Sequence, residues 1–494
     1  MLAQFERIVV DGVPAYIGDQ PGPVTAGIVF RVGSADESLL DHGVAALVAE
    51  LAAIDIEGLH WIVHETSTIF YTTGAAADVK QSLTSVCAAL RGLSEDDLID
   101  LADTILNEPK TGPLQPPVTI LSVRFGAQSY GLGGFPRLGL LRTNEPRIRA
   151  WVSRRYTRAN AILWSTGPLG RPRLGLPAGA RIPPPAPTPT KLALPAWCPQ
   201  DWIGATWRPF VYFCSVTPGS DAAIVADRVL EADIRQRARD AALGLADREA
   251  NINPWTADFD YTDFRIDVGP RVDDGVDALL GSIDDLADLG PENHALAQAL
   301  AEFESWTSDP SATPGVAAML AWHELMRGRP RNLDEFLSDI RAVSADEVAT
   351  VVAGMRDRAI VVVPEGAELI DPRFTTLEPT SAQPVVGIAY TAAPTPDDPA
   401  DDARLIVGAD GVTFVDGDEQ LTVRFAECVA AVRFPDDAFV LYAADGTMIS
   451  VAAREWTDGN SALARVRGGI DADRIVDATY EARLGAVEVV GAED

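Results

Sequence analysis

Two proline-rich stretches interrupt this sequence and constrain its fold more than any other feature, because they separate three parts with regular apolar patterns. Residues 168–200 include the run Pro183-Pro184-Pro185-Ala186-Pro187-Thr188-Pro189, which favours polyproline II and a stiff spacer. Residues 371–402 are rich in Pro, Thr, Ala and Asp, a composition typical of a flexible linker. We therefore predict three domains, at 1–167, 201–370 and 403–494. The length agrees, since single hydrophobic cores stop growing at about 250–300 residues.

The charge of the chain excludes several classes of partner. Its 494 residues carry a formal net charge of -32, so the long-range field repels phosphate and argues against a general nucleic-acid or anionic-lipid binder. A local basic patch is compatible with this total. The four cysteines are scattered without C-x-x-C spacing, which predicts a reducing compartment with no disulfides and no thiolate metal site. Because no signal peptide or membrane-spanning run is recognisable, we expect a cytoplasmic protein.

The first part alternates strand and helix patterns. In chain order it predicts a hairpin, a buried strand, a helix, one further strand and two helices, at residues 8–10 with 13–17, 24–32, 43–53, 61–73, 76–93 and 94–107. Asp41 is placed to cap the helix at 43–53, and Ser94 opens the last helix with capping-box spacing. The nearly continuous Ala, Leu and Val content of the helix at 43–53 predicts burial on almost every side.

The second part repeats this order, and the third part differs from both. Ser344 and Glu347 have the spacing of a capping box and mark a helix start near the end of the second part. Beyond residue 403, short apolar runs are separated by Asp410-Gly411, Asp416-Gly417, Pro435-Asp436 and Asp445-Gly446, which are hairpin signals. One helix, at 459–467, follows them. The third part is therefore predicted to be β-rich.

Residues 41–51 carry the most informative motif. They read Asp-His-Gly-Val-Ala-Ala-Leu-Val-Ala-Glu-Leu and follow Gly33-Ser34 and Glu37. The segment resembles the first helix of the pitrilysin/insulinase zinc peptidases, in which Gly-x-Ala-His-Phe-Leu-Glu-His places two histidine ligands around a general-base glutamate. Here the three chemical positions are occupied by Ala46, Ala49 and Glu50. The frame of the motif is retained, and its metal chemistry is not.

Other segments extend the resemblance. Residues 129–136 and 155–163 look like the family's Tyr-Gly-x-His-Pro turn and Tyr-Thr-Pro-x-Asn-Met strand entry. Residues 328–336 and 340–348 are similar to a helix, turn and helix start of its small bacterial and mitochondrial-processing-peptidase-like branch. The resemblance implies an α+β fold with two homologous insulinase-like α/β sandwich domains, which make half of a four-domain clamshell. The order of elements in the third part resembles a bacterial pleckstrin-homology-like fold.

The resemblance also gives positions for the third zinc ligand and for the groups that hold the substrate carbonyl. The third ligand is a glutamate, and Glu108 is the nearest match. Glu50 and Glu108 together would supply two carboxylates and no imidazole, whereas catalytic zinc sites use at least three protein ligands. The family's substrate-binding Arg and Tyr match Arg239, one residue out of register, and Asp247. An ionised carboxylate at 247 would repel a developing oxyanion.

None of the five histidines has a partner at metal spacing. His42 is expected to be an exposed turn residue beside the helix cap. His60 and His64 share one face of a predicted strand but lie about 13 Å apart along it, at about 3.3 Å per residue. His294 has the surroundings of a helix N-terminus, and His323 lies inside a predicted helix. We therefore expect no zinc and no other cofactor.

The sequence thus predicts a catalytically inactive insulinase-family subunit, or pseudopeptidase. We expect it to pair with a homologous zinc-bearing chain or with itself, and to contribute to peptide or protein binding, for example by strand addition at a sheet edge. Two alternatives stay open. One is an active zinc metallopeptidase that uses unconventional ligands, and the other is a scaffold or adaptor that recruits a protein through residues 403–494.

Overall fold

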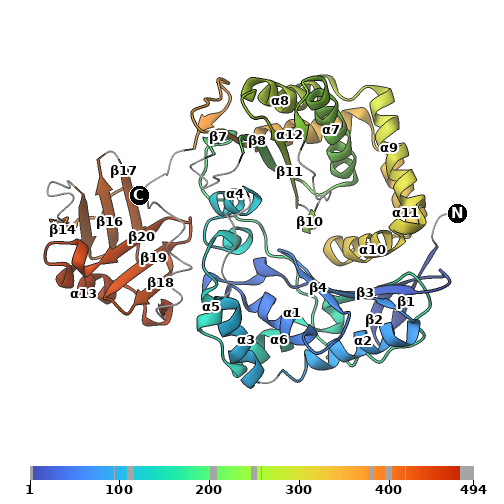
Figure 1. The fold of residues 1–494 in the computed structure, drawn as a ribbon, viewed down its shortest axis with the longest axis horizontal. Coiled ribbons are helices and arrows are strands. Elements are labelled where there is room, and N and C mark those ends of the chain that lie inside the picture. The colour runs from blue at the N-terminus through green and yellow to red at the C-terminus, as the bar shows by residue number, and fades with distance from the viewer. Residues whose placement is uncertain are drawn as a thin grey trace.

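The fold is described from a computed structural model, which covers residues 4–93, 95–107, 116–200, 208–245, 253–256, 259–377, 383–394, 403–417 and 419–478. Its elements form three groups, each with its own sheet or sheets (Figure 1). We call them the N-terminal unit (β1–β6), the second unit (β7–β13) and the C-terminal unit (β14–β21). Within the described residues, no helix is long and apolar enough to cross a membrane.

The N-terminal unit contains a six-stranded sheet in the order β1-β2-β6-β3-β5-β4. Its strands are β1 (Phe5–Val10), β2 (Val13–Gly18), β3 (Val24–Phe30), β4 (His60–Val63), β5 (Thr68–Gly74) and β6 (Ala161–Ser165). The predicted hairpin at Asp11-Gly12 is confirmed by the pairing of Val10 with Val13. The prediction of a single strand over 61–73 was wrong. A turn closed by a hydrogen bond from the His64 amide to the Ser67 carbonyl separates antiparallel β4 and β5.

Helices cover one face of this sheet. They are α1 (Val44–Ala53), α2 (Ala76–Ala89), α3 (Glu95–Asn107), the short α5 (Leu138–Leu141) and α6 (Glu145–Arg155). The predicted burial of α1 is confirmed, because most of its residues are buried against its neighbours. Figure 1 shows α1, α3 and α6 on the side of the sheet that faces away from the second unit.

The second unit repeats the first in its strand order. Its strands are β7 (Ala196–Pro199), β8 (Phe210–Thr217), β9 (Gly244–Leu245), β10 (Asn253–Thr256), β11 (Phe259–Asp267), β12 (Ile360–Val363) and β13 (Thr375–Thr376). Its order β10-β11-β8-β12-β7 repeats β4-β5-β3-β6-β2 of the first sheet, while the edge strand β13 is the last of these strands in the chain and does not correspond to β1. Each sheet also has a parallel pair at the matching place, β2 with β6 and β7 with β12, and the second sheet has a further parallel pair between β7 and β13. The repeat that the element order predicted is thus confirmed.

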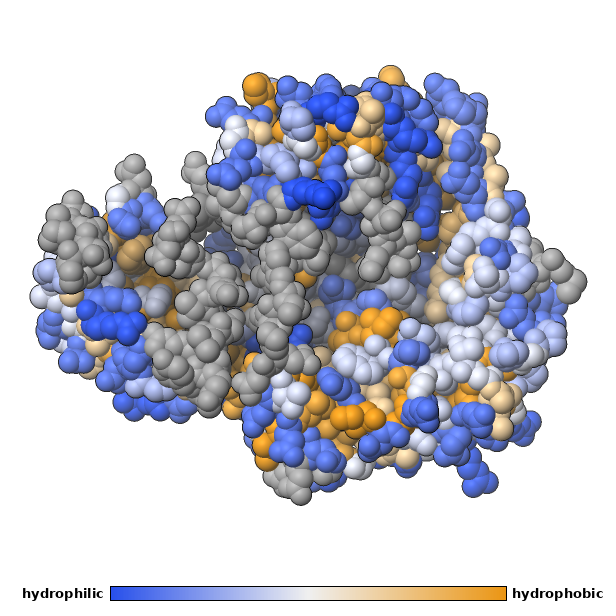
Figure 2. Space-filling model, viewed as in Figure 1, coloured by the Kyte–Doolittle hydropathy of each residue, from blue (hydrophilic) through white to orange (hydrophobic). Residues whose placement is uncertain are grey.

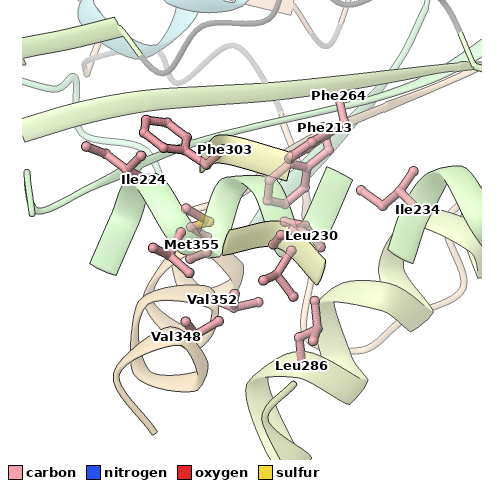
Figure 3. Close-up of a cluster of buried hydrophobic side chains, with 14 of the residues drawn as sticks. Phe213, Ile224, Leu230, Ile234, Phe264, Leu286, Phe303, Val348, Val352 and Met355 are labelled. Atoms are coloured by element: carbon pink, nitrogen blue, oxygen red, sulfur yellow. The ribbon is translucent and has the colours of Figure 1, made fainter. Parts of the chain in front are cut away.

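The helices of the second unit bury the main core. They are α7 (Asp221–Asp240), α8 (Val272–Leu289), α9 (Asn293–Ser308), α11 (Leu333–Arg341) and α12 (Ala345–Asp357). Figure 3 shows Phe213 and Phe264 of the sheet with Leu230, Leu286 and Val352 of the helices in one apolar cluster. The predicted capping box is confirmed at the start of α12, where Ser344 and Glu347 each accept a hydrogen bond from the other residue's backbone amide.

The two units exchange one helix each. The helix α10 (Thr313–Arg327) of the second unit packs on β2, β3 and β6 of the first sheet. The helix α4 (Pro116–Phe125) of the N-terminal unit places Ile120 and Phe125 in an apolar cluster with β8 and β12. Figure 1 shows both helices between the two sheets. Since a helix of each unit packs against the sheet of the other, the two units form one packed body.

The proline-rich stretch at 168–200 does not behave as a spacer. Its Leu174 and Leu176 are buried in the core of the N-terminal unit. The Arg181 guanidinium donates to the Glu324 carbonyl of α10 at 3.0 Å. Strand β7 also falls inside this stretch and pairs with β12. The physical reason is that proline blocks helix formation without preventing an extended segment from packing its apolar side chains.

The C-terminal unit has two four-stranded sheets and one helix. The strands are β14 (Gly387–Thr391), β15 (Arg404–Gly408), β16 (Gly411–Asp416), β17 (Glu419–Arg424), β18 (Cys428–Phe434), β19 (Ala438–Ala443), β20 (Met448–Ala452) and β21 (Ile475–Asp477), and the helix is α13 (Gly459–Gly469). The four predicted hairpins are confirmed. Strand β21 was not predicted; it follows α13 and pairs in parallel with β18. Strand β14 lies inside the predicted linker 371–402.

The C-terminal unit packs on the N-terminal unit through an apolar cluster that we call the docking cluster. Leu39, Leu132 and Leu138 of the N-terminal unit meet Val432 and Tyr442 of the C-terminal unit there. The Ala127 amide also donates to the Ala444 carbonyl at 3.1 Å.

On the face seen in Figure 2, the second unit is mostly hydrophilic, while hydrophobic patches reach the surface of the N-terminal unit.

Candidate functional site

The site indicated by the sequence is the helix α1, and its beginning is held by Glu37. The Glu37 carboxylate accepts hydrogen bonds from the backbone amides of Gly43 at 3.0 Å and Ala45 at 2.6 Å. A carboxylate at this end satisfies amides that lack an intrahelical partner and interacts favourably with the helix dipole. The predicted cap by Asp41 was therefore wrong. Asp41 instead accepts hydrogen bonds from Ser38 and Arg147.

Glycine at position 43 is required by two constraints. Its φ of 99° lies in the left-handed region, where other residues are strained. A side chain there would also come within 3.0 Å of Leu140 in α5. The retained glycine of the motif thus has a structural reason that is independent of catalysis.

The prediction of an exposed His42 was also wrong. His42 is buried, and its Nδ1 lies 3.0 Å from the Glu37 Oε2. The imidazole thus belongs to the same cap as the two amides. The sequence signal that could have indicated this contact is the acidic Glu37, which lies five residues before His42.

The three chemical positions of the motif lie in the middle of α1. Ala49 is fully buried, and Ala46 and Glu50 are half-buried. An alanine methyl group has no lone pair, so Glu50 is the one potential ligand among the three, and zinc does not fit this set of donors. Glu108 lies outside the described residues. In the part of the chain that the structure describes, no three His, Cys, Asp or Glu side chains are grouped so that they could hold a metal ion.

The remaining histidines make other contacts and are not grouped as metal ligands in the described part of the chain. His60 stacks on Tyr71 within the first sheet, and His64 stacks on Trp322 of α10 at a centroid distance of 5.4 Å. His294 is at the exposed start of α9, as predicted. His323 is buried in α10 beside the Phe336 ring. Each side chain has a structural neighbour that accounts for its position.

The predicted substrate-carbonyl positions are only partly visible. Arg239 is in the last turn of α7, where its guanidinium donates to the Gln236 side chain at 2.9 Å. Asp247 lies outside the described residues.

A second, basic feature adjoins α1 and was missed by the motif search. A solvent-open pocket of about 190 Å³ lies between α6 and the beginning of α1, and it is lined by Asp41, Val44, Arg147, Ala150, Trp151, Arg154 and Arg155. The signal that pointed to it is the density of arginine in and around α6, in a chain that is strongly acidic overall.

Comparison with solved structures identifies the fold. A chain of complex III2 from Candida albicans, with Inz-5 bound, matches with a TM-score of 0.56 at 13% identity, over 72% of this chain and 94% of that chain. A protease from Helicobacter pylori matches with a TM-score of 0.56 at 12% identity, over 73% of this chain and 99% of its own. A peptidase M16 inactive domain from Pseudomonas fluorescens matches with a TM-score of 0.53 at 14% identity, over 75% and 100%.

These matches show that about three quarters of the chain has the fold of the M16 (pitrilysin/insulinase) peptidases, as the sequence resemblance predicted. No protein-family profile and no curated protein matches the chain. The likeness of the C-terminal unit to a pleckstrin-homology-like fold stays a prediction.

Proposed function

We propose that this chain is a catalytically inactive subunit with an insulinase-like fold, which pairs with a homologous chain and helps to hold a peptide or protein. The observation that carries the proposal is the composition of α1. The helix is capped by Glu37 and buried in the core, yet it places methyl groups at two of the three chemical positions. The similarity to a solved M16 inactive domain supports the same reading.

The pairing follows from the number of repeats. The two units correspond to half of the four-domain clamshell that the resemblance implies, so a homologous chain or a second copy of this chain would complete it. Strand β4 supports a role in peptide binding, since it stands at the end of the first sheet and exposes Ile62. The open side of an end strand can pair with an extended peptide through backbone groups alone. The buried, free cysteines support a reducing, cytoplasmic compartment.

The experiment is to purify the full chain with its natural partners retained, and then to measure mass, zinc content and peptide cleavage. We expect a complex with a homologous chain or with itself, no stoichiometric zinc on this chain, and no cleavage by this chain alone. A monomer that binds stoichiometric zinc and cuts peptides would overturn the proposal. Under that alternative, Glu108→Ala should abolish both activity and zinc binding.

A further inference from the structure

Residues 137–158 have a charge opposite to that of the whole chain. They contain a single acidic residue, Glu145, and seven arginines: Arg137, Arg142, Arg147, Arg149, Arg154, Arg155 and Arg158. The chain as a whole has 72 acidic and 40 basic residues. Several of these arginines are held by contacts inside the protein, as Arg158 is by the Leu176 carbonyl, whereas Arg154 is exposed.

The structure gathers three of these arginines around the pocket described above. Arg147, Arg154 and Arg155 line it together with Trp151. All four belong to α6, which lies in the helix layer facing away from the second unit (Figure 1). The pocket is open to solvent and its Arg154 is exposed, so a partner can reach it.

The arginines of the pocket are held in different ways. Arg147 is ordered by Asp41 and by the Leu40 carbonyl, which it contacts at 2.6 Å. Arg154 is exposed and forms no ion pair with a described residue. Because Arg147 and Arg155 are positioned by contacts inside the protein, the pocket is already formed without a ligand.

Two donors in the pocket wall lack an acceptor. The Arg155 guanidinium stacks on the Trp151 ring at 3.6 Å and donates to the Asp36 carbonyl at 3.2 Å. The Arg155 Nε and the Trp151 Nε1 are both buried without a hydrogen-bond partner, and the whole Trp151 side chain is only 7% exposed. Buried donors without an acceptor are uncommon, because nothing offsets their loss of water. Burial also lowers the pKa of Arg155, with the Asp36 carboxylate acting in the opposite direction.

We propose that this pocket binds a carboxylate side chain from an acidic segment of a partner protein. A planar guanidinium pairs well with a carboxylate, and the exposed Arg154 can form such a pair beside Trp151 in the pocket. A polyphosphate backbone is disfavoured, because a chain of charge -32 repels a long polyanion more than a short acidic peptide. The proposal rests on α6 and on the residues beside it at the beginning of α1, and it requires neither zinc binding nor pairing with a homologous chain.

The test uses the full-length chain and a fluorescent peptide of alternating glycine and glutamate, with the matching glycine and glutamine peptide as its control. Fluorescence anisotropy should detect binding of the glutamate peptide and no binding of the glutamine peptide, and added salt should weaken the binding. Arg154→Gln should weaken it about tenfold or more, as loss of a charge-assisted hydrogen bond predicts. Trp151→Phe keeps an aromatic ring under Arg155, removes the Nε1 donor and should weaken the binding less than Arg154→Gln does.

Arg149→Gln is the matched control, because it removes the same charge from the same helix. Arg149 pairs with Glu145 and does not line the pocket, so this variant should change affinity by less than about twofold. Equal losses in the two variants would overturn the proposal, since they would reveal a diffuse charge effect. Binding of inorganic phosphate or a single-stranded oligonucleotide in place of the peptide would also overturn it. So would self-association that Arg154→Gln abolishes without any peptide binding.

Discussion

At the scale of single residues, the two alanines of the degenerate motif are not equivalent. Ala49 is fully buried in the core of the N-terminal unit, while Ala46 is half-buried. In the family pattern, position 49 would carry the general-base glutamate. In this fold the neighbours of α1 pack directly against the Ala49 methyl group, and the core is filled at the position of the general base.

We predict that Ala49→Glu lowers the free energy of unfolding by about 3 kcal/mol or more, because it buries a charge and overfills the core. Ala46→Glu is the matched variant and should cost less than about 1 kcal/mol, since its side chain can reach solvent. Urea denaturation of both variants measures the difference. A stable Ala49→Glu variant would mean that space for the catalytic group persists beside α1.

At the scale of elements, the exchanged helix α10 carries polar groups into the contact between the units. The Glu324 carboxylate accepts hydrogen bonds from Arg7 and Tyr16 of the first sheet, each at 2.7 Å. Both partners lie on the opposite unit, so the contact couples the folding of the two units. His323, its neighbour, is buried with its Nδ1 unpartnered.

Burial and the nearby Arg327 and Arg331 charges lower the pKa of His323 to about 3. The ordinary value in an unfolded chain is about 6.5, so the unfolded state binds one more proton between these pH values. The neutral histidine therefore contributes stability above pH 6.5, and this contribution is lost as the pH falls through the window.

We predict that His323→Gln reduces the loss of stability on acidification. Between pH 6.5 and 5.5, the native chain should lose about 1 kcal/mol more than the variant, since one pH unit corresponds to about 1.4 kcal/mol per proton. Chemical denaturation at several pH values measures this difference. The contribution of the carboxylates to the pH dependence is common to both proteins and cancels in the comparison. Identical pH profiles would show that His323 gains a proton readily in the folded chain.

At the scale of the whole molecule, the C-terminal unit is part of the packed structure and is joined to α1 through neighbouring elements. The docking cluster includes Leu138 of α5, and α5 contacts Gly43 at the beginning of α1. The Phe135 ring also meets the Tyr442 ring at a centroid distance of 6.2 Å. Removing this unit uncovers apolar side chains of the N-terminal unit.

We predict that deletion of residues 403–494 lowers the melting temperature by several degrees and promotes aggregation, because the docking cluster is exposed to water. Differential scanning calorimetry and light scattering measure both effects. Ile388→Ser is the control, since Ile388 is an exposed residue of the same unit outside the docking cluster, and it should change neither quantity. An unchanged melting temperature after deletion would instead support a separately attached adaptor module.

Local chemistry was predictable wherever neighbouring residues decide it. The hairpin at Asp11-Gly12, the burial of α1, the capping box of Ser344 and Glu347 and the turns of the C-terminal unit all follow from patterns within a few residues. The degenerate motif was visible for the same reason. The turn between β4 and β5 was missed, because its polar residues do not include the glycine or proline that marks most turns.

By itself, the sequence determined the repeated α+β order, the β-rich end and the absence of imidazoles at the motif positions, because these depend on residue types at short spacings. Only the tertiary structure decided that the two units exchange helices, and that Arg147, Arg154 and Arg155 surround one pocket with Asp41. The partners in these contacts are often more than a hundred residues apart, as Asp41 and Arg147 are. Their meeting is set by the packing of whole sheets and helices, which local patterns do not encode.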